Sequence, residues 1–309
     1  MSSPALESAL QGAAQHVAPE ATVRRTNSFL QLVKPRLNLL VVLTMLGGYY
    51  MGAPAGLPGW PLVFALLGAA LVAAGAAALN QYMERDLDSL MERTRNRPLP
   101  SGSLTPSACL AFGALLALAG MLTLAVLVNL LTAALALVTC VVYLVFYTPL
   151  KRVTPLNTLV GAIPGAIPPV MGWTATQASL GPEAAALFAI LFFWQMPHFL
   201  AIAWLYREDY ARAGFRMLPL EDGGAKRTGF AAVLYSTAMV PAALAPVLLG
   251  LAGNVYLVGA ALLSLGFLAA SANMARDPSE ASARWLFRIS LLVLPLLFLL
   301  MALDKVPRG

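Results

Sequence analysis

The stretch PLVFALLGAALVAAGAAALNQYMERDLDSLMERTRNRPLPSG, residues 61–102, contains the two features that decide the fold of this chain. Its first part, Pro61 to Leu79, is an apolar run of the length that crosses a bilayer as a helix. Its second part, Asn80 to Gly102, carries more charges than any other run in the first half of the chain. The pattern predicts a membrane-spanning helix that continues into a polar segment at the membrane surface.

The polar segment has a helical period. Asn80, Glu84 and Asp88 are spaced four residues apart, so they lie on one face if the helix continues past the apolar run. Four arginines lie among and after them: Arg85, Arg93, Arg95 and Arg97. Pro98 and Pro100 then end the helix. Oxygen ligands beside arginines suit a hard cation that is held together with a phosphorylated ligand, and magnesium is usually held in this way.

Charged loops between membrane helices also have a simpler explanation, because Lys/Arg-rich loops determine topology. That alternative accounts for the arginines, but not for acids that recur with a helical period at the membrane edge. Ionisable groups there are costly and mark functional sites. We therefore interpret Asn80, Glu84 and Asp88 as catalytic metal ligands. Phosphate-facing cations are expected at Arg85, Arg93 and Arg97.

Composition indicates an all-α polytopic membrane protein. The chain has 309 residues, of which 59% are hydrophobic and only 11% charged, with a mean hydropathy of +0.75. A soluble domain has about 25% charged residues. The net charge of +6 lies in the loops, so it does not indicate a nucleic-acid partner. Cys109 and Cys140 have no disulfide or metal-site spacing and are expected to be small core residues.

The apolar runs predict nine spans, at residues 37–54, 61–83, 106–124, 126–147, 156–174, 184–205, 229–250, 254–273 and 286–303. The break between the third and fourth spans is expected near Asn129. Residues 1–28 are polar and rich in Ala and Ser, and we expect them to form a disordered cytoplasmic tail. A single transmembrane domain is expected over residues 29–309.

Charge placement supports this topology. With nine spans and a cytoplasmic N-terminus, every Lys and Arg except Lys305 and Arg308 falls on one side of the membrane. The opposite loops, such as 52–59 and 250–254, carry no basic residue. Such asymmetry is typical of cytoplasmic loops and predicts a C-terminus on the outer side.

A second informative stretch is YLVFYTPLKRVTPLNTLVGAIPGAIPPVMGW, residues 143–173. Its candidate phosphate-side residues are Tyr147, Lys151, Arg152 and Asn157, at the expected cytoplasmic mouth. Lys and Arg there can hold phosphate oxygens, or they can simply set topology. The several prolines of the following span predict a kinked or interrupted helix that shapes a cavity. Gly161 and Gly165 fit the spacing that lets helices approach closely.

A third stretch is WQMPHFLAIAWLYREDYARAGFRMLP, residues 194–219. His198 is the only histidine in a predicted span, where it is either satisfied by a backbone carbonyl or acts as a ligand or proton donor in the cavity. Asp209, with Tyr206 and Tyr210 beside it, belongs to a second charged cluster on the same side as the first. Two acidic clusters at one mouth can together hold a metal–diphosphate.

These three stretches resemble the UbiA-type intramembrane prenyltransferase superfamily, over about residues 30–300. Asn80, Glu84 and Asp88, followed by RTRNRPLPSG at residues 93–102, resemble its first acidic motif, and residues 147–173 resemble its second conserved segment. Residues 194–219 resemble the version in the branch that transfers a farnesyl group to haem b.

The resemblance implies nine helices around a central cavity that opens to the cytoplasmic side and laterally to lipid. It implies that Mg²⁺ and the row Asn80, Glu84 and Asp88 hold the diphosphate of farnesyl diphosphate, with Tyr147, Lys151 and Arg152 on the diphosphate side and Lys151 also catalytic. The farnesyl group joins a vinyl group of haem b and water adds, giving haem O. Haem b is expected near His198 and Trp194, with His198 as an axial ligand or proton donor.

The implied location is a bacterial-type cytoplasmic (inner) membrane. The implied partners are farnesyl diphosphate, haem b and the lipid bilayer, with haem A synthase or terminal oxidase subunits as further candidates and no nucleic acid. The chain departs from the family at its second acidic motif, DxxxD, where Tyr206, Asp209 and Tyr210 occur instead. Whether carboxylates hold a second magnesium is therefore open.

Two other functions stay open at this point. The same fold can act on another acceptor, such as an aromatic acid or a chlorin. A small-molecule transporter is a different class, and it would predict paired internal repeats and charges at mid-membrane. The acids here lie at one membrane edge and no such repeat is evident, which counts against transport.

Overall fold

The computed structural model describes residues 27–53 and 59–307. This part of the chain is helical, and its only extended pairing is a single β-bridge between Ala252 and Lys305. The elements in chain order are α2 (Pro35–Gly52), α3 (Gly59–Asp88), α4 (Pro106–Leu127), α5 (Leu130–Val141), the π-helical turn η1 (Val142–Tyr147), α6 (Thr148–Leu150), α7 (Asn157–Gln177), α8 (Pro182–Leu205), α9 (Arg207–Arg212), the 3₁₀ turn η2 (Leu218–Leu220), α10 (Gly224–Leu248), α11 (Asn254–Arg276) and α12 (Glu280–Leu303).

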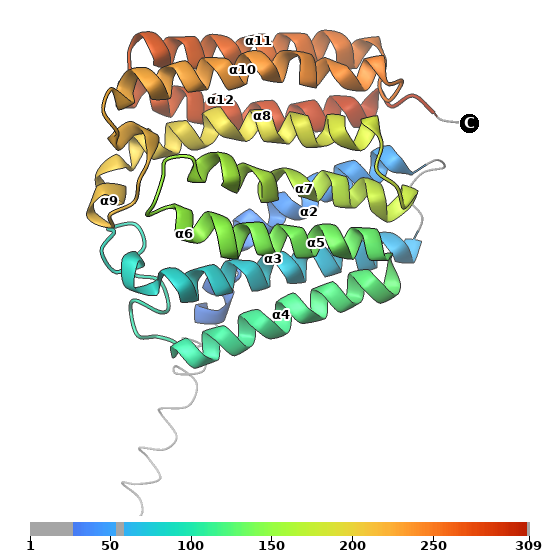
Figure 1. Cartoon of the computed structure of the whole chain (residues 1–309). Coiled ribbons are helices and arrows are strands. Elements are labelled where there is room, and N and C mark those ends of the chain that lie inside the picture. The colour runs from blue at the N-terminus through green and yellow to red at the C-terminus, as the bar shows by residue number, and fades with distance from the viewer. Residues whose placement is uncertain (1–26, 54–58, 308–309) are drawn as a thin grey trace, which may run out of the picture.

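The long helices lie side by side as a bundle (Figure 1). Seven helices of the described part are long and apolar enough to cross a membrane: α3, α4, the continuous segment Leu130–Leu150, α8, α10, α11 and α12. The prediction of an all-α membrane protein is thereby confirmed. Helices α2 and α7 lie at the first and fifth predicted spans, and that they also cross the membrane stays a prediction.

One predicted boundary is found in the structure, whereas the polar helix ends earlier than predicted, at Asp88 and not at Pro98, because turns follow Asp88. Helix α3 continues through 30 residues to Asp88, so the apolar run and the row of polar residues belong to one helix. The chain breaks between α4 and α5 at Asn129, whose side-chain oxygen accepts a hydrogen bond from Thr132 N at 2.8 Å. This N-cap satisfies a backbone donor at the helix start and explains why the long apolar stretch divides there.

Helix α7 is not interrupted, although Pro164, Pro168 and Pro169 lie inside it. The interruption that was one of the two expected forms is absent from this helix, whose three prolines are buried, and the kink that was the other form stays a prediction. The expected close packing at the glycines is confirmed. A Cβ on Gly161 would lie 2.6 Å from the Tyr147 ring, and a Cβ on Gly165 would collide with Gln195.

The predicted tail extends two residues too far. A helix runs over residues 27–32, and Ser28 in it is buried. The apolar side chain of Leu32 packs against Ala78 and Cys109, and its carbonyl accepts a hydrogen bond from Gln81 at 2.9 Å. These contacts hold the segment against α3. The rest of the predicted tail, residues 1–26, lies outside the described residues.

The charged segments gather at one end of the bundle. The loops that follow α3, the short helix α6 and the helix α9 all lie at the left end in Figure 1, and the C-terminus lies at the opposite end. Two large apolar clusters fill the space between the long helices. The fold therefore presents polar groups from several distant parts of the sequence at a single mouth.

Candidate active site

The three residues of the polar row on α3 are buried. Asn80, Glu84 and Asp88 are 1%, 4% and 0% exposed, and all three come from one helix face. Burying two carboxylates costs several kcal/mol per ion unless each is paired. The row therefore faces partners inside the protein, and not lipid.

Each side chain of the row contacts its own cation. Lys34 Nζ lies 3.3 Å from Asn80 Oδ1, and Lys151 Nζ lies 2.7 Å from Glu84 Oε1. Arg97 Nη1 donates to both oxygens of Asp88, at 2.8 and 2.7 Å. The three cations come from the start of α2, the turn after α6 and the loop after α3. The site is thus assembled from three separate segments around one helix.

Lys34 is the member of the site that sequence reasoning missed, because it was assigned only to topology. Its backbone is left-handed, with φ of 45°, a conformation that is uncommon outside glycine and clusters at functional sites. Burial, together with the charges of Arg97 and Lys151, lowers the pKa of Lys34 to about 7. Three cations therefore crowd this point, and an anion that binds there would relieve their repulsion.

Lys151 lies in an aromatic setting that keeps it charged. Its Nζ is 4.6 Å from the centre of the Tyr147 ring and 5.6 Å from that of Phe215. Burial alone lowers the pKa of Lys151, but Tyr147 and the Glu84 carboxylate outweigh burial and raise it above its ordinary value. Asn80 is held as well, since its amide donates to Thr148 Oγ1 at 3.0 Å.

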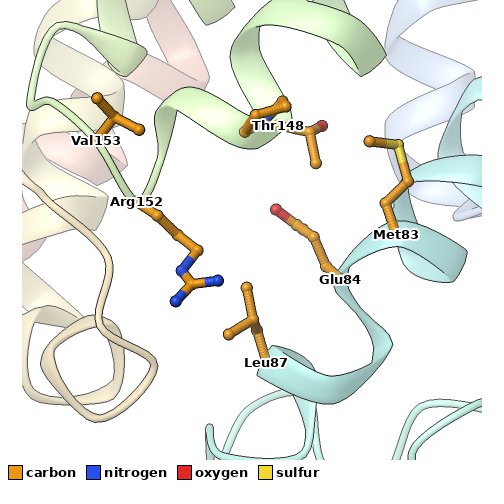
Figure 2. A pocket seen from close by; sticks show the side chains of 7 residues that line it. Met83, Glu84, Leu87, Thr148, Arg152 and Val153 are labelled. Atoms are coloured by element: carbon orange, nitrogen blue, oxygen red, sulfur yellow. The ribbon is translucent and has the colours of Figure 1, made fainter.

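Arg152 points elsewhere than Lys151, although the two are consecutive. It lines a pocket of about 480 Å³, into which Glu84 also points from α3 (Figure 2). The apolar side chains of Met83 and Leu87 border the same space. A carboxylate and a guanidinium thus face one amphipathic pocket. The predicted central cavity that opens to the cytoplasmic side stays a prediction.

Asp209 already has two partners. Its Oδ1 accepts a hydrogen bond from Glu92 N at 3.3 Å and forms an ion pair with Arg212. Across residues 27–53 and 59–307, no group of three or more His, Cys, Asp or Glu side chains is placed to hold a metal ion. The two carboxylates and one amide of the α3 row, each paired with a cation, remain the candidate metal ligands.

Other predicted site residues have distinct surroundings. Arg93 lies over the rings of Tyr206 and Tyr210, with 5.1 and 5.7 Å to their centres. Arg85 turns back on its own helix, where it donates to Tyr82 O at 2.8 Å. Asn157 is fully buried and donates to two backbone carbonyls, so it fixes the loops of the mouth and offers no free amide hydrogen.

His198 and Trp194 form a separate group between α8 and α12. His198 Nδ1 lies 2.7 Å from Ser290 Oγ, and Trp194 Nε1 donates to Ser290 O at 2.8 Å. The imidazole is stacked between Trp194 and Phe287, with centroid distances of 5.1 and 5.0 Å. With both ring faces covered and Nδ1 engaged, Nε2 is the edge atom left for a ligand.

A family model described as the UbiA prenyltransferase family matches residues 41–292. The chain therefore belongs to the UbiA prenyltransferase family, and it is an integral membrane protein. Among curated relatives, a protein of Koribacter versatilis (strain Ellin345) named "Protoheme IX farnesyltransferase" is 45% identical over 90% of this chain and 93% of its own length. A protein of Solibacter usitatus (strain Ellin6076) with the same name is 45% identical over 90% of this chain and 98% of its own length. The resemblance stated from sequence is confirmed.

Solved structures share the fold. One concerns a digeranylgeranylglyceryl phosphate synthase, with a TM-score of 0.77, 17% identity, and coverage of 91% of this chain and 98% of that chain. Another is a UbiA homologue from Archaeoglobus fulgidus bound to GPP and Mg²⁺, with a TM-score of 0.66, 17% identity, and coverage of 89% and 99%. The helical bundle of this chain is therefore the architecture of that family.

Proposed function

We propose that this chain transfers the farnesyl group of farnesyl diphosphate to a vinyl group of haem b, with addition of water, to give haem O. The observation that carries the proposal is the buried row of Asn80, Glu84 and Asp88, each paired with a cation. The name shared by relatives that are 41–45% identical over about nine-tenths of the chain supports haem b as the acceptor.

The row fits one magnesium ion. Two carboxylates and an amide oxygen on one helix face match the ligands that Mg²⁺ takes beside substrate phosphates. Asn80, Glu84 and Asp88 would form the metal–diphosphate motif, and bound magnesium would supply Lewis-acid stabilisation of the leaving diphosphate. The solved homologue with GPP and Mg²⁺ supports this use of the fold.

The cations of the site then act on the diphosphate. Lys34, Lys151 and Arg97 lie at the row and can contact phosphate oxygens once a metal takes over the carboxylates. When the bond between C1 of the farnesyl group and the diphosphate oxygen breaks, the electron pair leaves with that oxygen. The three cations stabilise this charge more strongly in the transition state than in the ground state, which lowers the barrier.

Aromatic side chains surround the position where an allylic cation would form. Tyr143 and Tyr147 stack with 5.6 Å between their ring centres, beside Lys151. Ring faces attract cations, and apolar walls keep bulk water from the farnesyl cation until a vinyl carbon attacks it. Water then supplies a hydroxyl to the other vinyl carbon and loses a proton. His198, through Nε2, is the proposed axial ligand or proton donor on the haem side.

The proposal includes the arrangement in the membrane. We infer nine spans, with α2 and α7 completing the seven that length and hydropathy define, in a bacterial-type cytoplasmic membrane. The basic loops support a cytoplasmic N-terminus and an outer C-terminus. Docking of haem A synthase or of terminal oxidase subunits stays a prediction.

The test is direct. Membranes that contain the protein are incubated with haem b, farnesyl diphosphate and Mg²⁺, and the product mass is measured. Formation of hydroxyethylfarnesyl haem is expected, and Asp88→Asn is expected to abolish it while the protein still inserts and folds. Unchanged turnover in Asp88→Asn would refute the site, and prenylation of a different acceptor would refute the substrate.

A further inference from the structure

Arg93 is a fixed cation at the mouth. Its guanidinium lies over the rings of Tyr206 and Tyr210, and its Nη2 is 3.4 Å from Tyr210 Oη. The two tyrosines are four residues apart at the start of α9, so both face the loop that carries Arg93. Two ring faces orient the guanidinium without neutralising its charge.

One acid between the two tyrosines, Asp209, is occupied by other groups. Asp209 accepts from Glu92 N and pairs with Arg212, and only 9% of its side chain is exposed. Because Glu92 precedes Arg93, this contact fastens the Arg93 loop to α9. Asp209 is thus a positioning residue, and both of these contacts engage its Oδ1.

Arg93 and Lys151 belong to one connected group. The Tyr210 ring is 6.0 Å from the Phe215 ring, over which Lys151 Nζ lies at 5.6 Å. Burial raises the pKa of Tyr210, and the charges of Arg93, Lys151 and Glu84 also act on it. The guanidinium is therefore connected through the rings of Tyr210 and Phe215 to Lys151, the partner of Glu84 in the α3 row.

The charge balance of the site indicates a role for Arg93, and this role rests on the proposed function. With Lys34, Lys151 and Arg97 all protonated, the row, these three cations and one magnesium together carry the charge opposite to that of a fully ionised farnesyl diphosphate trianion. When the carbon–oxygen bond breaks, the electron pair stays on the leaving group, which becomes a diphosphate tetraanion. One more positive charge then becomes favourable at the mouth.

We propose that Arg93, held by Tyr206 and Tyr210, is that charge, and that it takes the place of a second carboxylate-bound metal ion. The site then works with one divalent ion, and Arg93 interacts most strongly with the diphosphate as it leaves. In this arrangement Tyr206 and Tyr210 hold the Arg93 guanidinium at the position where a pair of acids would otherwise hold a metal ion.

The experiment compares two ligands on the full-length protein in detergent. Binding of inorganic diphosphate and of a non-hydrolysable farnesyl thiodiphosphate is measured with Mn²⁺, and bound Mn²⁺ is counted by electron paramagnetic resonance. We expect one Mn²⁺ per chain. Arg93→Ala is expected to weaken inorganic diphosphate roughly tenfold to a hundredfold, the range of a lost charge-assisted hydrogen bond, and the farnesyl analogue by less.

Arg95→Ala is the matched control, since Arg95 lies in the same loop but pairs with Glu92 at 2.9 Å. It is expected to bind both ligands as the unmodified chain does, and Arg93→Lys is expected to fall between the two. Two bound Mn²⁺ per chain, or equal binding by Arg93→Ala and Arg95→Ala, would overturn this inference alone. If the unmodified chain bound neither ligand, the proposed function would fail with it.

Discussion

Lys151 Nζ lies 2.7 Å from Glu84 Oε1, and this ion pair joins the turn after α6 to the polar end of α3. Both side chains are almost fully buried, with 11% and 6% of their areas exposed. Pairing removes the need for either charge to reach water. The ion pair thereby connects α6 and α3 through the candidate site. Substitutions of Lys151 or Glu84 are therefore expected to affect both stability and activity.

Breaking this pair should destabilise the protein. Lys151→Met leaves Glu84 buried without a partner, a situation that typically costs about 3–5 kcal/mol. The double variant Lys151→Met/Glu84→Gln, which removes both charges, should be more stable than the single variant. Thermal unfolding in detergent of the single and double variants would measure this, and a Lys151→Met protein as stable as the unmodified chain would contradict it.

Lys34 should contribute to binding of the prenyl diphosphate. Lys34→Ala removes a cation next to Asn80, and we expect roughly tenfold weaker binding of farnesyl diphosphate in the presence of Mg²⁺. Arg36→Ala is the control, because Arg36 is exposed and lies two residues further along. Isothermal titration calorimetry with farnesyl diphosphate would measure the affinity of both variants. The prediction fails if Lys34→Ala and Arg36→Ala bind the ligand with equal affinity.

Space at Gly161 should control the position of Tyr147. Gly161→Ala places a methyl group 2.6 Å from the Tyr147 ring, and overpacking of this kind costs about 1–3 kcal/mol. Displacement of that ring from Lys151 should lower turnover by roughly tenfold to a hundredfold. Gly266→Ala in α11 meets no atom within 4 Å and should leave the rate unchanged. Steady-state kinetics of the two variants provide the comparison.

Ser290 should orient His198 for haem. Ser290→Ala removes the partner of Nδ1, and loss of such a supporting hydrogen bond to a metal ligand typically costs tenfold to a hundredfold in affinity. Ser290→Thr should restore binding. Ser264→Ala, which removes a buried hydroxyl that bonds only within α11, is the control. Titration with haem b, followed by its Soret band, tests this; equal affinity in Ser290→Ala and Ser264→Ala would exclude the role.

The helices and the row on α3 could be predicted because their signals are local. Hydropathy over about twenty residues identifies a span, and a spacing of four places Asn80, Glu84 and Asp88 on one face. The break at Asn129 is also local, because a cap acts on the turn that follows it.

The partners of these groups could not be predicted in the same way. Lys34 meets Asn80 across 46 positions, and Glu92 meets Asp209 across 117. Such contacts depend on how helices pack, and no spacing in the sequence records them. For the same reason the sequence places Asp209 in a second charged cluster but does not predict its partners, which are the backbone N–H of Glu92 and the guanidinium of Arg212.

The pairing of Glu84 and Asp88 with Lys151 and Arg97 also bears on the order in which substrates load. With a metal–diphosphate complex bound, Glu84 and Asp88 would face the divalent ion, and Lys151 and Arg97 would face the phosphate oxygens. A divalent ion alone, or a diphosphate alone, would gain fewer favourable contacts at these two ion pairs. On the proposed function, the paired carboxylates would therefore favour entry of the metal–diphosphate complex as a unit over entry of a cation alone.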